Sequence, residues 1–155
     1  MPRCTALDLP VVPDRLHAAG ALAGIHAAAG WAATRGAAGV IAVACDMPFL
    51  SAPLLAEIAR RAQRAPDADV IAPESGGRRG AEPLCAYYST RCIAAIEHAI
   101  ARDDRRVIGF WEDVRVENVP IDVVRTFGEP DHLFMNVNTR DERDQADALA
   151  SAQHG

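Results

Sequence analysis

The sequence predicts an α/β protein, a three-layer α/β/α sandwich around a mostly parallel sheet. Two observations carry this prediction. Short apolar stretches alternate along the chain with longer segments of helical periodicity, which is the element order of a layered α/β domain. The stretch from Val40 to Leu50 also begins with six small or β-branched apolar residues without polar alternation, which is typical of a strand buried on both faces.

Length and composition limit the possible architectures and partners. The chain has 155 residues, half of them apolar, which predicts a single domain over residues 1–155. A formal charge of -5 argues against nucleic acid or an anionic membrane as a partner, because such binding needs clustered basic residues. All 16 basic residues are arginine, so the chain encodes no phosphate-binding loop that relies on lysine.

The cysteines and the hydropathy pattern predict where the protein works. Four cysteines lack the paired spacing of a zinc site, and no secretory signal pattern precedes them. No apolar run reaches the roughly 20 residues that span a bilayer. We therefore expect a cytoplasmic protein with reduced thiols and no membrane association.

The apolar run of Val40–Leu50 stops at Asp46, and Pro48 follows it. In open α/β sheets, ligands bind in the crevice outside the carboxyl ends of the strands. Asp46 is therefore a candidate residue for handling a metal ion or a phosphate.

Two segments precede this strand. Leu7–Asp14 contains two prolines, which allow only an edge strand or a short strand. Glycines bracket the turn Gly20–Gly24, before an alanine-rich helix predicted for Ile25–Thr34. Such a turn can expose backbone amides that bind anions at a helix N-terminus. It can equally be a tight strand-to-helix turn whose glycines only permit close packing.

The middle of the chain predicts one helix, one strand and one loop. Ser51 caps a helix with Pro53 in its first turn, and the strand Asp69–Pro73 follows. The loop Glu74–Gly80 then lies at a strand end. Its Arg78 and Arg79 are candidates for contacting an anionic substrate, although a solvated loop explains them as well.

The last part of the chain predicts two strands and two helices. Pro83–Tyr88 is a strand, Ser89 caps the helix after it, and Val114–Val124 is an edge or irregular strand because of its proline. Thr139 and Glu142 have capping-box spacing for a helix from about Arg140 toward Ala150. Asn136 and Asn138 stand just before that helix; they are turn residues unless this segment lies beside Asp46.

Four segments, taken together, resemble the molybdenum cofactor guanylyltransferase family. They run in the family's order along most of the chain: Val11–Asp14 with Gly20–Ile25, Cys45–Phe49, Arg105–Val107 and Phe134–Thr139. The set is specific to the nucleotidyltransferase superfamily and less so to its guanine branch. The resemblance implies the Rossmann-like three-layer fold of that superfamily.

The resemblance also implies an activity and a site. It implies transfer of a guanylyl group from GTP to molybdopterin with Mg2+, with GTP, molybdopterin and molybdoenzyme-maturation proteins as partners. Asp46 matches the family aspartate that binds Mg2+ and the nucleotide and is the implied catalytic residue. Asp14 matches a second nucleotide-contacting aspartate, and the glycine turn flanks the nucleotide through Gly20, Leu22, Ala23 and Gly24. Asn136 and Asn138 match the asparagines that close the site on the substrate side.

The chain departs from the family pattern at its start. The family opens with a strand and a glycine-rich loop containing Arg and Lys, about sixty residues of a first βαβ unit that this sequence lacks. Without the loop that holds the triphosphate, we expect little activity from these 155 residues alone. Either the natural protein starts further upstream, or this is an N-terminally truncated copy.

The same sequence features also fit other activities. A molybdopterin cytidylyltransferase or a sugar-phosphate nucleotidyltransferase would share Asp46 and the sheet. A non-catalytic binding module that keeps the pterin-facing half of the fold is the alternative outside the enzyme class.

Overall fold

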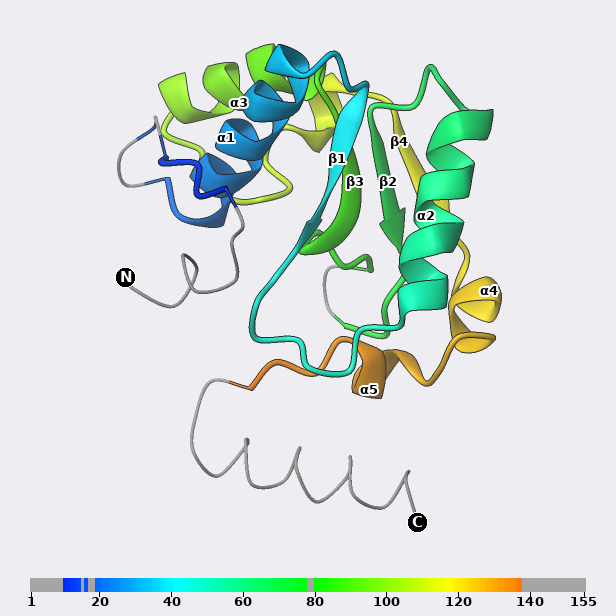
Figure 1. Cartoon of the computed structure of the whole chain (residues 1–155). Coiled ribbons are helices and arrows are strands. Elements are labelled where there is room, and N and C mark those ends of the chain that lie inside the picture. The colour runs from blue at the N-terminus through cyan, green and yellow to red at the C-terminus, as the bar shows by residue number, and fades with distance from the viewer. Residues whose placement is uncertain (1–9, 15, 17–18, 78–79, 138–155) are drawn as a thin grey trace.

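The computed structural model of the chain describes residues 10–14, 16, 19–77 and 80–137 (Figure 1). Its strands are β1 (Gly39–Val43), β2 (Val70–Pro73), β3 (Cys85–Ser89) and β4 (Val116–Val119). Its helices are α1 (Ala21–Thr34), α2 (Ala52–Arg64), α3 (Cys92–Ala101), α4 (Ile121–Arg125) and α5 (Pro130–Leu133), with a 3-10 turn at Trp111–Asp113. No helix in these ranges is both long and apolar enough to cross a membrane.

The four strands form one mixed sheet in the order β1-β3-β2-β4. β3 pairs antiparallel with both β1 and β2, whereas β2 and β4 pair parallel. β1, β2 and β4 therefore run in one direction and β3 runs against them. The α/β fold class is confirmed, and the predicted mostly parallel sheet contains this one reversed strand.

Helices cover both faces of the sheet, which makes the three predicted layers (Figure 1). α1 and α3 pack together on one face, over a core around Leu22, Tyr88 and Ile96. α2 lies on the other face, over a second core around Leu54 and Ile71. The alternation of side chains along each strand supplies both cores, because successive residues of a strand point to opposite faces.

Among the described strands β1 lies at an edge of the sheet, and its partial exposure corrects the expectation that it is buried on both faces. Its four residues Gly39–Ala42 are only half-buried, and Val43 is 48% exposed. The Ala38 carbonyl accepts the Thr90 N–H, and the Ala44 N–H donates to the Leu84 carbonyl. The backbone groups of the even-numbered residues of β1 therefore point toward β3. The backbone groups of the odd-numbered residues point away from the described sheet.

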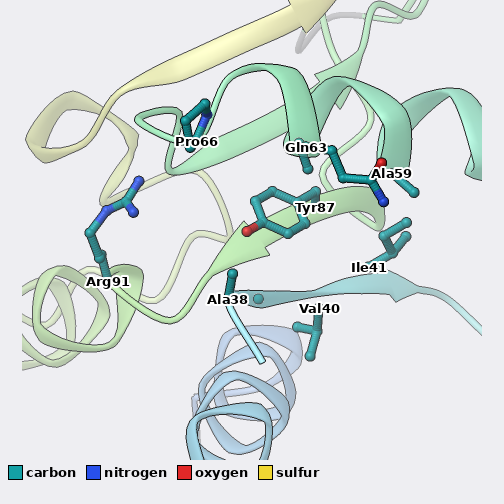
Figure 2. Close-up of a pocket in the computed structure, with 10 residues that line it drawn as sticks. Ala38, Val40, Ile41, Ala59, Gln63, Pro66, Tyr87 and Arg91 are labelled. Carbon is teal, nitrogen blue, oxygen red and sulfur yellow. The ribbon is translucent and has the colours of Figure 1, made fainter. Parts of the chain in front are cut away.

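A groove of about 410 Å³ runs beside the amino-terminal half of β1 (Figure 2). The second half of α2 forms one wall through Ala59, Ala62 and Gln63, and the Tyr87 ring from β3 lies between that helix and β1. Gly39 is required beneath this ring, because a Cβ atom there would come within 2.6 Å of it. The groove is thus at the opposite end of β1 from Asp46.

Several predicted elements change their bounds or type. The predicted strand Val114–Val124 is wrong beyond Val119, because Pro120 ends β4 and the chain continues as helix α4. No strand forms over residues 10–14 of the predicted Leu7–Asp14 segment. Ser89 is the last residue of β3 rather than the cap of α3, and its hydroxyl accepts the Arg91 backbone N–H.

Candidate active site at the carboxyl end of β1

Asp46 follows β1 in a turn at the carboxyl edge of the sheet. The Ala44 N–H donates to the Leu84 carbonyl at 2.9 Å, which is the last rung between β1 and the chain entering β3. The chain then leaves the sheet, and Asp46 is half-buried two residues further on. The predicted position of a carboxylate at a strand's carboxyl end is confirmed.

The segment that carries Asn136 lies directly beside this turn. The Val137 N–H donates to the Asp46 backbone carbonyl at 2.8 Å, although 91 positions separate the two residues along the chain. Asn136 is exposed next to this bond, so the condition that the sequence set for a ligand role is met. Asn138 lies outside the described residues, as does the predicted helix after it.

Two further contacts fasten the Asp46 turn to α5. The Phe49 ring stacks on the His132 ring, with centroids 4.1 Å apart and planes at 30°. Met47 and Leu133 are almost completely buried in the same apolar cluster. In Figure 1 the loop that leaves β1 and the orange α5 segment accordingly lie at the same lower end of the molecule. No sequence pattern predicts these partners, because more than 80 positions separate them along the chain.

The glycine turn is the first turn of α1, which corrects its expected form. α1 begins at Ala21, so Gly24 lies inside the helix and Gly20 caps it with a φ of 55° that favours glycine. The side chains of Leu22 and Ala23 are buried in the core, and the Ala23 N–H already donates to the Gly20 carbonyl at 3.1 Å. Only backbone groups at the very start of α1 are available to an anion.

The structure defines the positions of the other predicted site residues less well than those of Asp46 and Asn136. Asp14 is exposed in a segment without regular secondary structure. Arg78 and Arg79 lie outside the described residues. Their loop begins directly after the carboxyl end of β2, at the same edge of the sheet as Asp46. Glu74, its first residue, accepts the Ile121 N–H at 2.8 Å and so joins the end of β2 to the start of α4.

A second pocket, of about 320 Å³, opens where the chain enters β3, lined by Pro83 and residues 105–108. Its arginines are ion-paired: Arg106 binds Asp104 with two nitrogens, and Arg105 binds Asp103. The hydrogen bonds from Arg106 lower the pKa of the Asp104 carboxyl to about 2. A phosphate group in this pocket would compete with those carboxylates for the guanidinium groups.

The oxygen groups near Asp46 suit a hard cation that shares its ligands with a substrate. Within residues 10–14, 16, 19–77 and 80–137, no three His, Cys, Asp or Glu side chains gather to hold a metal ion. Mg2+ commonly binds one or two carboxylates, keeps several waters and takes further oxygens from phosphates. A single carboxylate at Asp46, with Asn136 adjacent in sequence to its backbone partner Val137, fits that mode of binding and would not fit a closed protein cage.

This combination defines a class of protein: a three-layer α/β domain whose β1 carboxyl edge presents an aspartate beside an asparagine-bearing C-terminal segment. Residues 1–116 match the MobA-like NTP transferase domain. The chain belongs to this family.

Similar proteins carry consistent names. The chain is 38% identical over 145 residues to a "probable molybdenum cofactor guanylyltransferase" of Pelotomaculum thermopropionicum, covering 93% of this chain and 66% of that protein. It is 34% identical to a molybdenum cofactor guanylyltransferase of Bradyrhizobium sp., covering 97% of this chain and 69% of the relative. The chain thus spans about two thirds of the length of these relatives.

Solved structures show the same fold. A crystal structure of molybdopterin-guanine dinucleotide biosynthesis protein A from Archaeoglobus fulgidus matches with a TM-score of 0.69 and 29% identity, covering 84% of this chain and 63% of that one. A putative protein from Aquifex aeolicus matches with the same TM-score at 20% identity, over 90% of this chain and 68% of that one. This second likeness concerns the fold alone.

Proposed function

We propose that this domain takes part in molybdenum cofactor biosynthesis as the Mg2+-dependent guanylyltransferase that joins GMP from GTP to molybdopterin. The names of its relatives support the reaction class. The observation that carries the proposal is the hydrogen bond from the Val137 N–H to the Asp46 carbonyl at 2.8 Å. It unites in one place two segments that the family resemblance assigns to one site.

Each part of this edge has a task in the proposed reaction. The Asp46 carboxylate would hold Mg2+, which would supply neutralisation of charge on the nucleotide phosphates. Asn136 and Asn138 orient the pterin substrate, and Arg78 and Arg79 reach its phosphate. A phosphate oxygen of molybdopterin attacks the α-phosphorus of GTP, and the bond to pyrophosphate breaks. The chain supplies mainly positioning and electrostatic stabilisation, which dominate this kind of transfer.

Asp14 and the start of α1 complete the proposed nucleotide site. Asp14 is exposed and so is accessible to a ribose or a metal-bound water. The first backbone N–H groups of α1, after Gly20, offer donors to a phosphate. Leu22 and Ala23 act only through the helix that they anchor in the core, because their side chains are buried.

The proposal is tested by replacing Asp46 with Asn, which keeps the shape of the side chain and removes its charge. In a version of the protein that also carries the family's glycine-rich loop, we expect pyrophosphate release from GTP with Mg2+ and molybdopterin to fall by about a hundredfold or more, because the metal would lose its protein carboxylate. Asp67→Asn is the matched control: Asp67 is an exposed carboxylate before β2, at the other end of the sheet, paired with Arg115. Equal rates for the Asp46 variant and the control would remove Asp46 from the site.

The choice of base is a separate question with its own measurement. GTP and CTP compete for the same site in this proposal, and GTP is expected to bind more tightly. Tighter binding of CTP would instead support the cytidylyltransferase alternative. A domain that binds molybdopterin without releasing pyrophosphate from either nucleotide would be the non-catalytic module.

A further inference from the structure

The Asp46 turn and the C-terminal segment are joined at two points rather than one. At the first point, Val137 donates its N–H to the Asp46 carbonyl at 2.8 Å. At the second, the Phe49 ring stacks on the His132 ring at 4.1 Å. One hydrogen bond alone would leave the two segments free to rotate about it, whereas two separated contacts fix both distance and orientation.

His132 is held by packing rather than by hydrogen bonding through its ring Nε2. That atom is shielded from solvent and has no hydrogen-bond partner among the described residues. The backbone of α5 is closed by its own hydrogen bonds, since His132 and Leu133 both donate their N–H groups to the carbonyl of the N-cap residue Glu129, at 3.0 and 2.8 Å. The His132 ring therefore interacts with Phe49 through its stacked face. In this position its buried Nε2 atom has no hydrogen-bond partner among the described residues.

We propose that His132 is a positioning residue: its stack on Phe49 closes the Asp46 turn against the Asn136 segment and so sets the Asp46 carboxylate beside Asn136. The role in catalysis rests on the function proposed above, but the closure itself is a property of the fold. Met47 and Leu133 bring the two segments into contact in one apolar cluster, and the ring stack determines their alignment.

The experiment measures amide hydrogen exchange at Val137 in the wild-type chain and in two variants of equal apolar character. His132→Leu fills the space without an aromatic face, whereas His132→Phe preserves the stack. We expect the Val137 amide to exchange about fivefold faster in His132→Leu, because this variant loses the energy of the stacked ring pair. We expect His132→Phe to exchange at close to the wild-type rate, and the amides of β2 and β3 to be unaffected in both variants.

Three results would overturn the proposal. Val137 exchange in His132→Leu could equal that of the wild type, it could rise only in parallel with the β2 and β3 amides, or His132→Phe could be as fast as His132→Leu. The exchange measurement is independent of turnover. A version of the protein that also carries the family's glycine-rich loop and showed protected Val137 but no pyrophosphate release would contradict the proposed function and leave the closure standing.

Turnover gives the second readout. Misalignment of Asp46 in His132→Leu should lower kcat more than it raises KM for GTP, because the nucleotide would keep its other contacts while the Asp46 carboxylate is out of place. His132→Phe should restore kcat. If the substitutions only lowered overall stability, both variants would contain less active protein, and His132→Phe would not restore kcat.

Discussion

At the scale of single residues, backbone context decides which predicted groups can act. Asp46 was predictable, because a carboxylate after a purely apolar stretch has few positions other than the end of a strand. The burial of Leu22 and Ala23 inside a helix was not predictable, because the sequence pattern does not show whether the helix starts before or after them. His132 gave no local signal, since its importance comes from Phe49, far away in the sequence. The sequence thus predicts the position of Asp46 better than it predicts the residues that pack beside its turn.

The three described cysteines differ sharply in their exposure to solvent. Cys45 is exposed, next to Asp46, whereas Cys85 and Cys92 are buried under the helices. Burial, reinforced by Glu82, raises the pKa of the Cys85 thiol to about 12. Burial, reinforced by Asp69, does the same for the pKa of Cys92. Both thiols therefore stay protonated near neutral pH, where only a thiolate is nucleophilic.

We expect iodoacetamide at pH 8 to label Cys45 in the native chain and to leave Cys85 and Cys92 unmodified. Unfolded chains should be labelled at all three, because the thiol pKa returns to its ordinary value of 9.0. The folded pKa lies above the unfolded one, so the stabilising effect of these thiols is complete below pH 9 and is lost as the pH rises toward 12. Peptide mapping by mass spectrometry measures the labelling, and rapid native labelling of Cys85 would contradict the burial.

At the scale of elements, local sequence rules succeed where a breaker residue bounds a regular stretch and fail where it lies inside one. The segment Asp69–Pro73 was predicted as a strand and forms β2, fully buried. Ser51 with Pro53 correctly marked the start of α2, although Ser51 makes no side-chain capping bond. Val114–Val124 failed because the valines on both sides of Pro120 have the same strand-like character. The proline there separates a strand from a helix, and only tertiary packing selects the helix.

Gly39 shows how one element depends on a side chain from another. A Cβ atom at this position would meet the Tyr87 ring at 2.6 Å and lie closer still to the Tyr88 carbonyl. Since the carbonyl belongs to the β1·β3 ladder, it cannot move away as a flexible side chain would. β1 therefore needs glycine at its first residue for close approach to β3.

We expect Gly39→Val to destabilise the chain by roughly 1–3 kcal/mol in urea unfolding, despite the high strand propensity of valine. Gly30→Ala is the matched comparison, because it lies inside α1 with nothing within 4 Å of the new Cβ. That substitution should raise the free energy of unfolding by about 0.5–1 kcal/mol through helix propensity. A stabilising Gly39→Val would mean that β1 and β3 pair differently.

At the scale of the whole molecule, the alternation of elements predicted the layers but not the strand order. Helices and strands take turns along the chain, and this sufficed for an α/β sandwich. The order β1-β3-β2-β4 and the reversed direction of β3 depend on pairings between distant segments, such as Gly39 with Ser89. Apolar composition made β1 look like a central strand. Its place at the edge of the described sheet follows from pairing, which composition does not encode.

The edge of β1 gives a prediction for the behaviour of the chain in solution. Residues 39–43 contain no charge and no proline, the usual guards against edge-to-edge pairing. We expect Val43→Lys to reduce concentration-dependent self-association of these 155 residues in light scattering, because Val43 is 48% exposed and a lysine there opposes pairing. The free energy of unfolding should change by less than about 0.5 kcal/mol. Unchanged association would show that the β1 edge does not mediate it.

The pairing of β1 with β3 also has a consequence during synthesis. Among the described strands, β3 is the hydrogen-bonded neighbour of β1. About 50 residues must be translated after Gly39 before Ser89 exists, which takes roughly 3–10 s at the usual rates of ribosomes. Throughout that interval the nascent chain carries a completed apolar stretch whose neighbour among the described strands has not yet been made. The Asp46 turn forms later still, because Val137 is added only after β3 and β4. The candidate active site is thus among the last parts of the molecule to be assembled as the chain leaves the ribosome.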